Sequence, residues 1–258
     1  MRFGYCASIQ DAPLLKELGY DYLECVLRDL DGMSPGELRE ARSLLRETGL
    51  AAEAFNCFYG PQRLVGEDAT PLPELLDYTN RALERAAELG GKIAVYGSGR
   101  ARHIPEGLSR EKAKGQFCEA VWHTAEAARQ FGITLVLEPL NTGETNFFHT
   151  VEEGAGLVKE IGHSNLFLLA DWYHVCREGE PFEQIVQAGP LLRHIHLAEP
   201  VNRRVPRMGD GADYGAMGAA LARAGYQARV SIEAIHDPAR TLRQEAQEGL
   251  EVLRRYFA

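Results

Sequence analysis

The stretch ITLVLEPLNTGE, residues 133–144, begins as a short run of β-branched and leucine residues and then places a glutamate at position 138. A continuous apolar run of this length is typical of a buried strand. A carboxylate is costly to bury unless it is paired or binds a metal. Glu138 is therefore either a surface residue at a strand end or part of a functional site, and the rest of the chain must decide.

Runs of the same kind recur along the whole chain, and segments with helical spacing lie between them. The eight strand-like runs are RFGYCA (2–7), YDYLECV (20–26), LAAEAFNCF (50–58), KIAVYGSG (92–99), ITLVLEPL (133–140), NLFLLAD (165–171), LRHIHLAE (192–199) and RVSIEAI (229–235). Apolar residues at helical spacing indicate amphipathic helices at 34–49, 71–90, 109–132 and 238–258.

This alternation predicts the fold class. Strands that alternate with helices require a parallel sheet with helical crossovers, and eight such units in 258 residues predict an α/β protein with a (β/α)8 TIM barrel. A doubly wound open sheet is the alternative, but YCASIQDA (5–12) stands where its glycine-rich phosphate fingerprint belongs. GSGR (97–100) lacks the remaining spacing and is interpreted as a strand-end turn. No linker divides the chain, so we expect a single domain over residues 1–258.

Composition and charge exclude several classes of protein. The chain carries 28 Lys and Arg against 37 Asp and Glu, a net charge of -9, which disfavours a nucleic-acid partner. No segment approaches the roughly 18 to 20 apolar residues of a membrane span, and MRFGYCASIQ has no apolar run of signal-peptide length. We therefore expect a cytoplasmic protein without a membrane partner. The five cysteines have no CxxC spacing, which predicts neither a disulfide framework nor a zinc knuckle.

The last four strands each deliver a side chain able to bind a metal where the strand ends. These residues are Glu138, Asp171, His196 and Glu233. Because the strand ends of a barrel meet at one mouth, three carboxylates would repel one another there unless a cation lay between them. Singly, each residue is more often a helix cap or a solvated charge, but four in register predict a site for one divalent metal. Oxygen-rich ligation favours Mn²⁺, with Mg²⁺, Co²⁺ or Zn²⁺ as alternatives. His194 lies on the same strand face, and we expect it one layer deeper.

Four segments resemble the xylose isomerase-like barrel superfamily and, within it, the ketose 3-epimerases. The segments are EPLNTGE (138–144), ADWYH (170–174), HLAE (196–199) and SIEA (231–234). The resemblance implies that Glu138 and Glu233 are both metal ligands and the catalytic acid–base pair. It also implies that Glu144 and His174 bind the substrate.

An arginine shortly after the histidine strand completes the implied substrate-binding set. Arg203 matches that position best, and Arg204 is its possible substitute in the segment EPVNRRVPRMGDG (199–211). The implied partner is a small-molecule sugar or sugar phosphate, and the implied reaction is the interconversion of ketose C3 epimers. One carboxylate would remove the proton next to the C2 carbonyl, and the other would return a proton to the opposite face through a metal-stabilised enediolate.

Other enzymes of similar pattern remain alternatives. An aldose–ketose isomerase, an inosose-pathway enzyme or a sugar-phosphate isomerase could use the same four ligands. Hydroxypyruvate isomerases resemble the chain over EPxN and SIE but have glutamine in place of His196. An endonuclease IV-like DNA repair enzyme would need further histidines where NCFYG (56–60) and VYGSG (95–99) stand. A non-catalytic sugar-binding protein would have no reason to carry bases on both faces of its ligand. Barrels of this kind often form a homo-oligomer, but the sequence identifies no interface.

Lesser candidates lie on the early strands and after the fourth strand. The early-strand residues, which we interpret as core or rim, are Tyr5, Cys6, Glu24, Asn56, Phe58 and Tyr96. The segment 100–103 carries Arg100, Arg102 and His103, which we interpret as a solvated basic loop. If this loop converged with Arg203, Arg204 and Arg207, the substrate would be a sugar phosphate.

Overall fold

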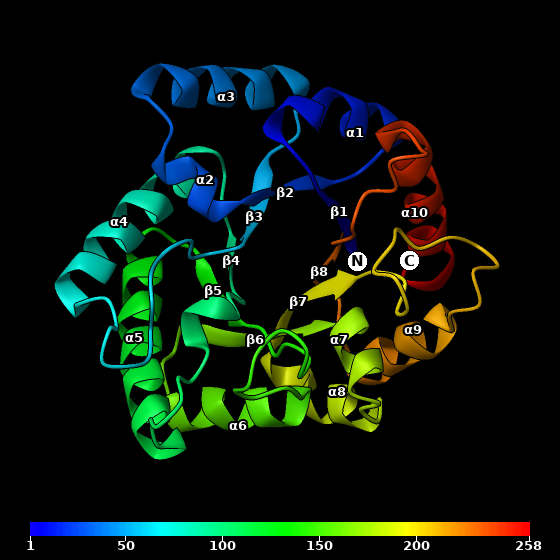
Figure 1. The fold of residues 1–258 in the computed structure, drawn as a ribbon. Coiled ribbons are helices and arrows are strands. Elements are labelled where there is room, and N and C mark those ends of the chain that lie inside the picture. The colour runs from blue at the N-terminus through cyan, green and yellow to red at the C-terminus, as the bar shows by residue number, and fades with distance from the viewer.

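The computed structural model describes all 258 residues and shows a closed barrel of eight parallel strands surrounded by helices (Figure 1). The strands are β1 (Arg2–Cys6), β2 (Tyr22–Val26), β3 (Ala52–Asn56), β4 (Ile93–Tyr96), β5 (Thr134–Leu137), β6 (Leu166–Asp171), β7 (Leu192–Leu197) and β8 (Arg229–Ile232). Each strand pairs with its neighbours in chain order, and β1 closes the ring against β8. The predicted single-domain (β/α)8 barrel is confirmed, and every strand lies within a predicted run.

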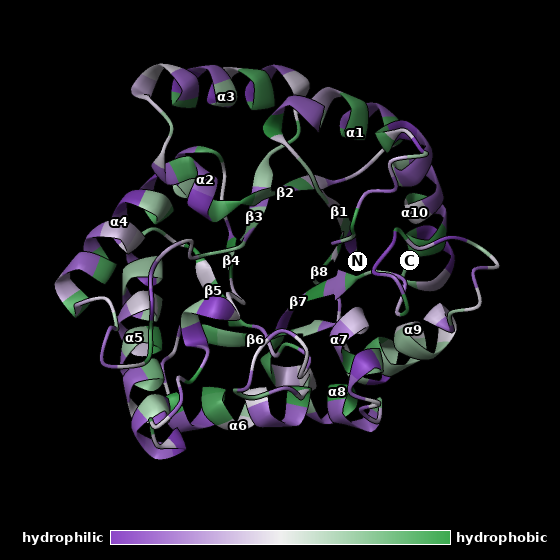
Figure 2. Cartoon of the chain, viewed as in Figure 1, coloured by the Kyte–Doolittle hydropathy of each residue, from purple (hydrophilic) through white to green (hydrophobic).

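The helices follow the strands and cover the outside of the barrel. They are α1 (Ala12–Leu18), α2 (Leu27–Asp31), α3 (Pro35–Thr48), α4 (Leu72–Glu88), α5 (Arg110–Gln130), α6 (Val151–Ile161), α7 (Trp172–Arg177), α8 (Glu183–Ala188), α9 (Tyr214–Arg223) and α10 (Leu242–Tyr256). The four predicted helical segments contain α3, α4, α5 and α10. Figure 2 shows apolar and polar residues mixed along these helices, as expected where one face packs on the barrel and the other meets water. None of them combines the length and apolar content that a membrane crossing requires.

Local sequence signals fix where the helices begin and end. The side chain of Ser34 accepts a hydrogen bond from the Glu37 amide, and the Glu37 carboxylate accepts one from the Ser34 amide, which forms a capping box at the start of α3. Gly49 ends the same helix with φ 67°, a left-handed conformation that glycine adopts without strain. Capping boxes built on Thr150 and Thr241 begin α6 and α10 in the same way.

The barrel interior is layered, and one layer supports the site. Six buried residues form a small cluster apart from the main core: Tyr22, Ala54, Ile93, Val95, Val136 and Leu169. Side chains two positions apart on a strand share a face, so Val136 and Leu169 lie one layer below Glu138 and Asp171. The hydroxyl of Tyr22 bonds to Ser231 Oγ at 2.7 Å across this layer. The residues that end the strands therefore stand on a packed floor.

Gly4 in β1 tests the packing of this floor. A Cβ at this position would lie 2.3 Å from the ring of Tyr22. We expect Gly4→Ala to displace Tyr22 and to lower the free energy of unfolding by about 1–3 kcal/mol, the usual cost of overpacking a core. Gly115→Ala in α5 is the matched control, because nothing lies within 4 Å of its added Cβ. Urea unfolding measures both variants, and equal destabilisation would contradict the described packing.

Candidate active site

The structure brings the four predicted strand-end residues together at the carboxyl ends of the strands. Glu138 follows β5, Asp171 ends β6, His196 lies in β7 and Glu233 follows β8. One oxygen or nitrogen from each of the four lies within 4.8 Å of those from the other three. Glu138, Asp171 and His196 are buried. Three carboxylates and one imidazole in this arrangement could hold a divalent metal ion.

Burial and neighbouring charges push the pKa values of the three carboxyl groups in different directions. Burial raises the pKa of Glu138 above its ordinary value, and the nearby His196 only partly opposes this shift. Burial likewise raises the pKa of Asp171, against the opposing charge of Arg203. Burial would also raise the pKa of Glu233, but His196 and Arg203 together hold it well below its ordinary value. Carboxyl groups with divergent pKa values in one pocket are typical of acid–base sites.

Glu24, in the middle of β2, holds His196 in place. Its Oε1 lies 2.8 Å from Nε2 of His196, and its Oε2 lies 2.8 Å from Nε2 of His194, with all three side chains fully buried. Burial alone would raise the pKa of Glu24, but the two histidines lower it well below its ordinary value. Nδ1 of His196 therefore faces Glu138 at 3.2 Å and Glu233 at 3.4 Å. A carboxylate on the second nitrogen is the usual support for a metal-binding histidine.

The sequence prediction for Glu24 as a core or rim residue missed this contact. Its partners lie 170 and 172 residues along the chain, so no local pattern could show it. His194 lies fully buried below the site, as expected. Asn56 was also interpreted as core or rim, but its Nδ2 donates to Glu233 Oε1 at 2.8 Å. Both early-strand residues support the ligand set from the opposite side of the barrel.

Arg203 faces the carboxylates. Its Nη2 lies 2.5 Å from Glu233 Oε2 and 3.5 Å from Asp171 Oδ2, and its Nη1 donates to Glu144 Oε1 at 3.1 Å. The backbone at Arg203 has φ 55°, a left-handed conformation that is uncommon for a residue other than glycine. The neighbouring Arg204 turns away and donates to backbone carbonyls after β8. Of the two arginines that the sequence offered, Arg203 is therefore the one that lines the site.

The remaining predicted contact residues, Glu144 and His174, meet at Asn141. The Asn141 amide N–H donates to Nδ1 of His174 at 3.2 Å, and the Asn141 side chain donates to Glu144 Oε1 at 3.1 Å. Burial lowers the pKa of His174, so the ring is neutral and carries its hydrogen on Nε2. That nitrogen has no hydrogen-bond partner and lies 3.5 Å from Asp171 Oδ2. It is a buried donor beside the Asp171 carboxylate.

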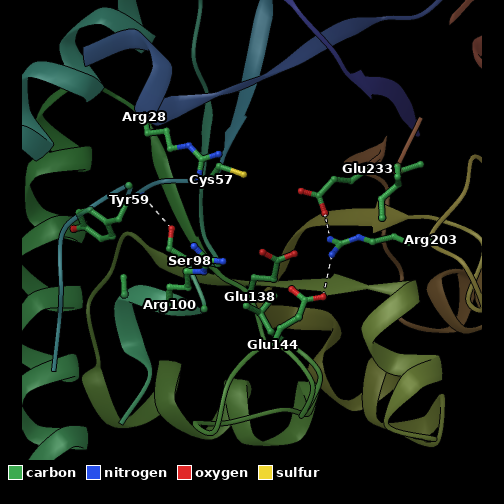
Figure 3. Close-up of a pocket in the computed structure, with 16 residues that line it drawn as sticks. Arg28, Cys57, Tyr59, Ser98, Arg100, Glu138, Glu144, Arg203 and Glu233 are labelled. Atoms are coloured by element: carbon green, nitrogen blue, oxygen red, sulfur yellow. Dashed lines mark hydrogen bonds and ion pairs between the residues drawn. The ribbon is translucent and has the colours of Figure 1, made fainter. Parts of the chain in front are cut away.

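Part of the strand-end group lines a pocket of about 600 Å³ (Figure 3). Glu138, Glu144, Arg203 and Glu233 gather on one side, and Arg28, Cys57, Tyr59, Ser98 and Arg100 lie on the other. The turn after β4, which carries Ser98 and Arg100, approaches Glu138 at Gly97. A Cβ at Gly97 would lie 1.7 Å from Glu138 Oε2, so only glycine leaves room for this carboxylate. The GSGR segment is a strand-end turn, as predicted, and its first glycine serves the site through its small size.

The prediction that residues 100–103 form a solvated basic loop is wrong for Arg102. This side chain is only 1% exposed, and its Nη1 donates to the backbone carbonyl of Glu138 at 2.8 Å. Its guanidinium carbon lies 3.9 Å from the ring centroid of Phe148, a cation–π contact. Burial lowers the pKa of Arg102 to about 9, although Glu138 opposes the shift. The residue anchors the backbone that carries Glu138, whereas Arg100 and His103 are exposed.

The structure therefore belongs to the class of (β/α)8 barrels that carry polar, potentially metal-binding side chains at the carboxyl ends of the strands. The chain belongs to the xylose isomerase-like TIM barrel family, whose model matches residues 12–256. The resemblance predicted from the sequence is thereby confirmed.

Individual relatives agree with this assignment. The chain is 30% identical over 205 residues to a D-psicose 3-epimerase of Agrobacterium fabrum, covering 75% of this chain and 68% of the relative. It is 29% identical over 226 residues to a ketose 3-epimerase of Arthrobacter globiformis, covering 84% of this chain and 74% of the relative. The crystal structure of a D-psicose 3-epimerase with D-tagatose from Clostridium cellulolyticum H10 superposes with a TM-score of 0.88 at 23% identity, covering 100% and 99% of the two chains. The structural similarity supports the same fold.

Gly97 offers a test of the position of Glu138. We expect Gly97→Ala to force the Glu138 carboxylate out of the group of four and to weaken Mn²⁺ binding by about tenfold or more, as displaced metal ligation commonly does. Calorimetric titration with Mn²⁺ measures the affinity, and the thermal midpoint reports whether the variant still folds. Gly156→Ala in α6, where an added Cβ meets nothing within 4 Å, is the control. Native affinity in a folded Gly97→Ala variant would show that Glu138 is placed incorrectly.

Proposed function

We propose that this protein is a metal-dependent sugar epimerase that interconverts ketoses at C3. The observation that carries the proposal is the pairing of Glu138 and Glu233 across one pocket. Their strands, β5 and β8, are not neighbours in the barrel, and His196 lies between the two carboxylates at 3.2 and 3.4 Å. Two carboxylates that reach a substrate from different sides fit a reaction that removes a proton on one face and returns it on the other. The epimerase activity of the relatives named above supports the same reaction.

The residues at the mouth fit a single divalent metal ion. Glu138, Asp171 and Glu233 would supply oxygen and His196 would supply Nδ1, since its Nε2 is engaged by Glu24. This oxygen-rich set favours Mn²⁺, with Mg²⁺, Co²⁺ and Zn²⁺ as alternatives. When bound, such an ion would supply Lewis-acid polarisation of the substrate carbonyl and hydroxyl oxygens.

The two catalytic carboxyl groups would divide the work by their different environments. His196 and Arg203 hold the pKa of Glu233 below its ordinary value against the effect of burial, and this carboxylate would accept the proton from C3. Burial raises the pKa of Glu138, and this group would return a proton to the opposite face of C3. The roles exchange when the epimer reacts in the reverse direction, because the same path must serve both.

The neighbouring polar groups would orient the sugar. Nε2–H of His174 and the guanidinium of Arg203 would donate to substrate oxygens, and Glu144 would accept from a hydroxyl. Asn56 would keep Glu233 aimed at the substrate through its 2.8 Å hydrogen bond. These contacts would hold the reacting carbon between the two carboxylates, where orientation contributes much of the rate.

Metal removal tests the dependence on an ion. We expect chelator-treated protein to lose activity on a panel of ketopentoses and ketohexoses and to recover it with Mn²⁺, because the carbonyl would otherwise lack its electrophilic partner. Chromatography of the sugars measures the C3 epimers formed. Full activity of the metal-free protein would overturn the proposed dependence, and products of C1–C2 transfer would instead identify an aldose–ketose isomerase.

Isotope exchange tests the two bases. We expect Glu138→Gln and Glu233→Gln each to reduce epimerisation by about a hundredfold to ten-thousandfold, the usual contribution of a general base or acid. Proton NMR in D₂O measures deuterium incorporation at C3 of the ketose. Glu67→Gln is the matched control, since Glu67 is an exposed loop residue outside the pocket. Native exchange rates in both pocket variants would show that other groups move the proton.

A further inference from the structure

The pocket has a second wall that the proposed chemistry does not use. Arg28, at the start of α2, and Arg100, after β4, line it together with Ser98. Figure 3 shows these side chains on the side of the pocket opposite Arg203 and Glu233. The pocket is therefore acidic at the end that carries the two catalytic carboxylates and basic at the end remote from Glu233.

The two guanidinium groups of this wall have no strong acidic partner. The only carboxylate within 4.0 Å of Arg28 belongs to its neighbour Asp29, at 3.8 Å between two exposed side chains, a contact worth little in water. No carboxylate lies within 4.0 Å of Arg100. Acidic residues outnumber basic ones by 37 to 28 in this chain, so two uncompensated arginines in one pocket run against its charge balance. By contrast, Arg203 contacts the carboxylates of Glu144 and Glu233 at 3.1 and 2.5 Å.

The backbone around the wall is held firmly and leaves space. The Arg28 amide donates to the carbonyl of Cys57, whose φ of 47° is uncommon for a residue other than glycine. Ser98 Oγ accepts from the Tyr59 amide at 2.9 Å, which leaves its own proton free to donate to a ligand. The glycines that line this region are Gly60, Gly97 and Gly99. At Gly97 and Gly99 the space is taken by Glu138, Leu140 and the backbone of Glu144, whereas at Gly60 only Cδ of Arg28 lies within 4 Å of an added Cβ, so Gly60 keeps the wall open beside Arg28.

We propose that this wall binds a phosphate ester at the end of the sugar remote from the reacting carbons, so that the substrate is a phosphoketose. The inference rests on the proposed epimerase function and names its substrate class. A phosphate monoester carries a charge of about -1.5 to -2 and three acceptor oxygens, which match two guanidinium groups and a hydroxyl donor. A neutral hydroxymethyl group would leave both cations without a counterion.

Only one arginine of this wall is among those that the sequence suggested for binding a phosphate. Arg203 turns to the carboxylates, Arg204 turns to backbone carbonyls, and Arg207 lies outside the pocket. Arg100 remains from the predicted loop, and Arg28, which no sequence motif indicated, joins it. The anion-binding wall is thus built from the start of α2, directly after β2, and from the turn after β4.

Paired substrates test this inference in the metal-loaded enzyme. We expect kcat/KM for D-fructose 6-phosphate and D-ribulose 5-phosphate to exceed that for the unphosphorylated ketoses by about tenfold or more, the effect of one charge-assisted contact. Arg28→Gln and Arg100→Gln should each reduce this preference by about tenfold, mainly through KM, and the Lys variants should restore part of it. Arg39→Gln on α3 is the matched control, because Arg39 is exposed and outside the pocket.

Separate outcomes bear on the substrate class and on the function. Equal or better kcat/KM for the neutral ketoses, or a preference unchanged in both Gln variants, would overturn the phosphate assignment. If neither sugar class exchanges deuterium, the proposed function fails, and calorimetric titration then tests the wall alone. Binding of D-fructose 6-phosphate that is at least about tenfold tighter than that of D-fructose, and that is lost in the double Gln variant, would still support the wall. Equal binding of the two sugars would overturn it.

Discussion

The buried carboxylate of Glu24 between His194 and His196 is the interaction on which the mouth of the barrel depends. Both oxygens of this carboxylate are used at 2.8 Å, and neither histidine could turn without leaving a buried charge unpaired. The ring of His196 is thereby fixed with Nδ1 toward Glu138 and Glu233. Glu24, a residue of β2, thus sets the geometry of side chains at the ends of β5, β7 and β8. This contact is possible because the sheet closes into a barrel, so that side chains of β2 and β7 meet in its interior.

The rest of the site is supported in the same manner, by residues that lie behind the groups that would react. Gly97 leaves the space that the Glu138 carboxylate occupies, and Arg102 holds the backbone of the same residue. Asn56 restrains Glu233 from the other side. Strands and strand ends move less than free loops, so a site built on them keeps its geometry to the accuracy that proton transfer requires. The packed layer that contains Tyr22 and Val136 supplies the floor for all of these contacts.

The sequence could predict the architecture because strand and helix periods alternate along the whole chain. It could also predict which residues meet at the mouth, since the carboxyl ends of parallel strands converge and Glu138, Asp171 and Glu233 each end or follow a strand. It could not predict what each residue touches across the barrel. The burial of Arg102 depends on an aromatic ring and a carbonyl that packing brings to it, so a basic segment looked solvated. Arg28 carries no motif, and only its position at the start of α2 places it over the pocket.

The opposed walls of the pocket have a consequence for selectivity. A ligand that places its anionic end against Arg28 and Arg100 has a fixed direction in the pocket, and its chain must then span the space to Glu138 and Glu233. The number of carbons between the anionic group and the reacting carbon would then decide which carbon meets Glu138 and Glu233. The configuration of any single hydroxyl would matter less. Substitutions that move the positive charges of the basic wall nearer to the two carboxylates, or farther from them, would therefore change which carbon of the sugar reacts. They would not change the type of reaction.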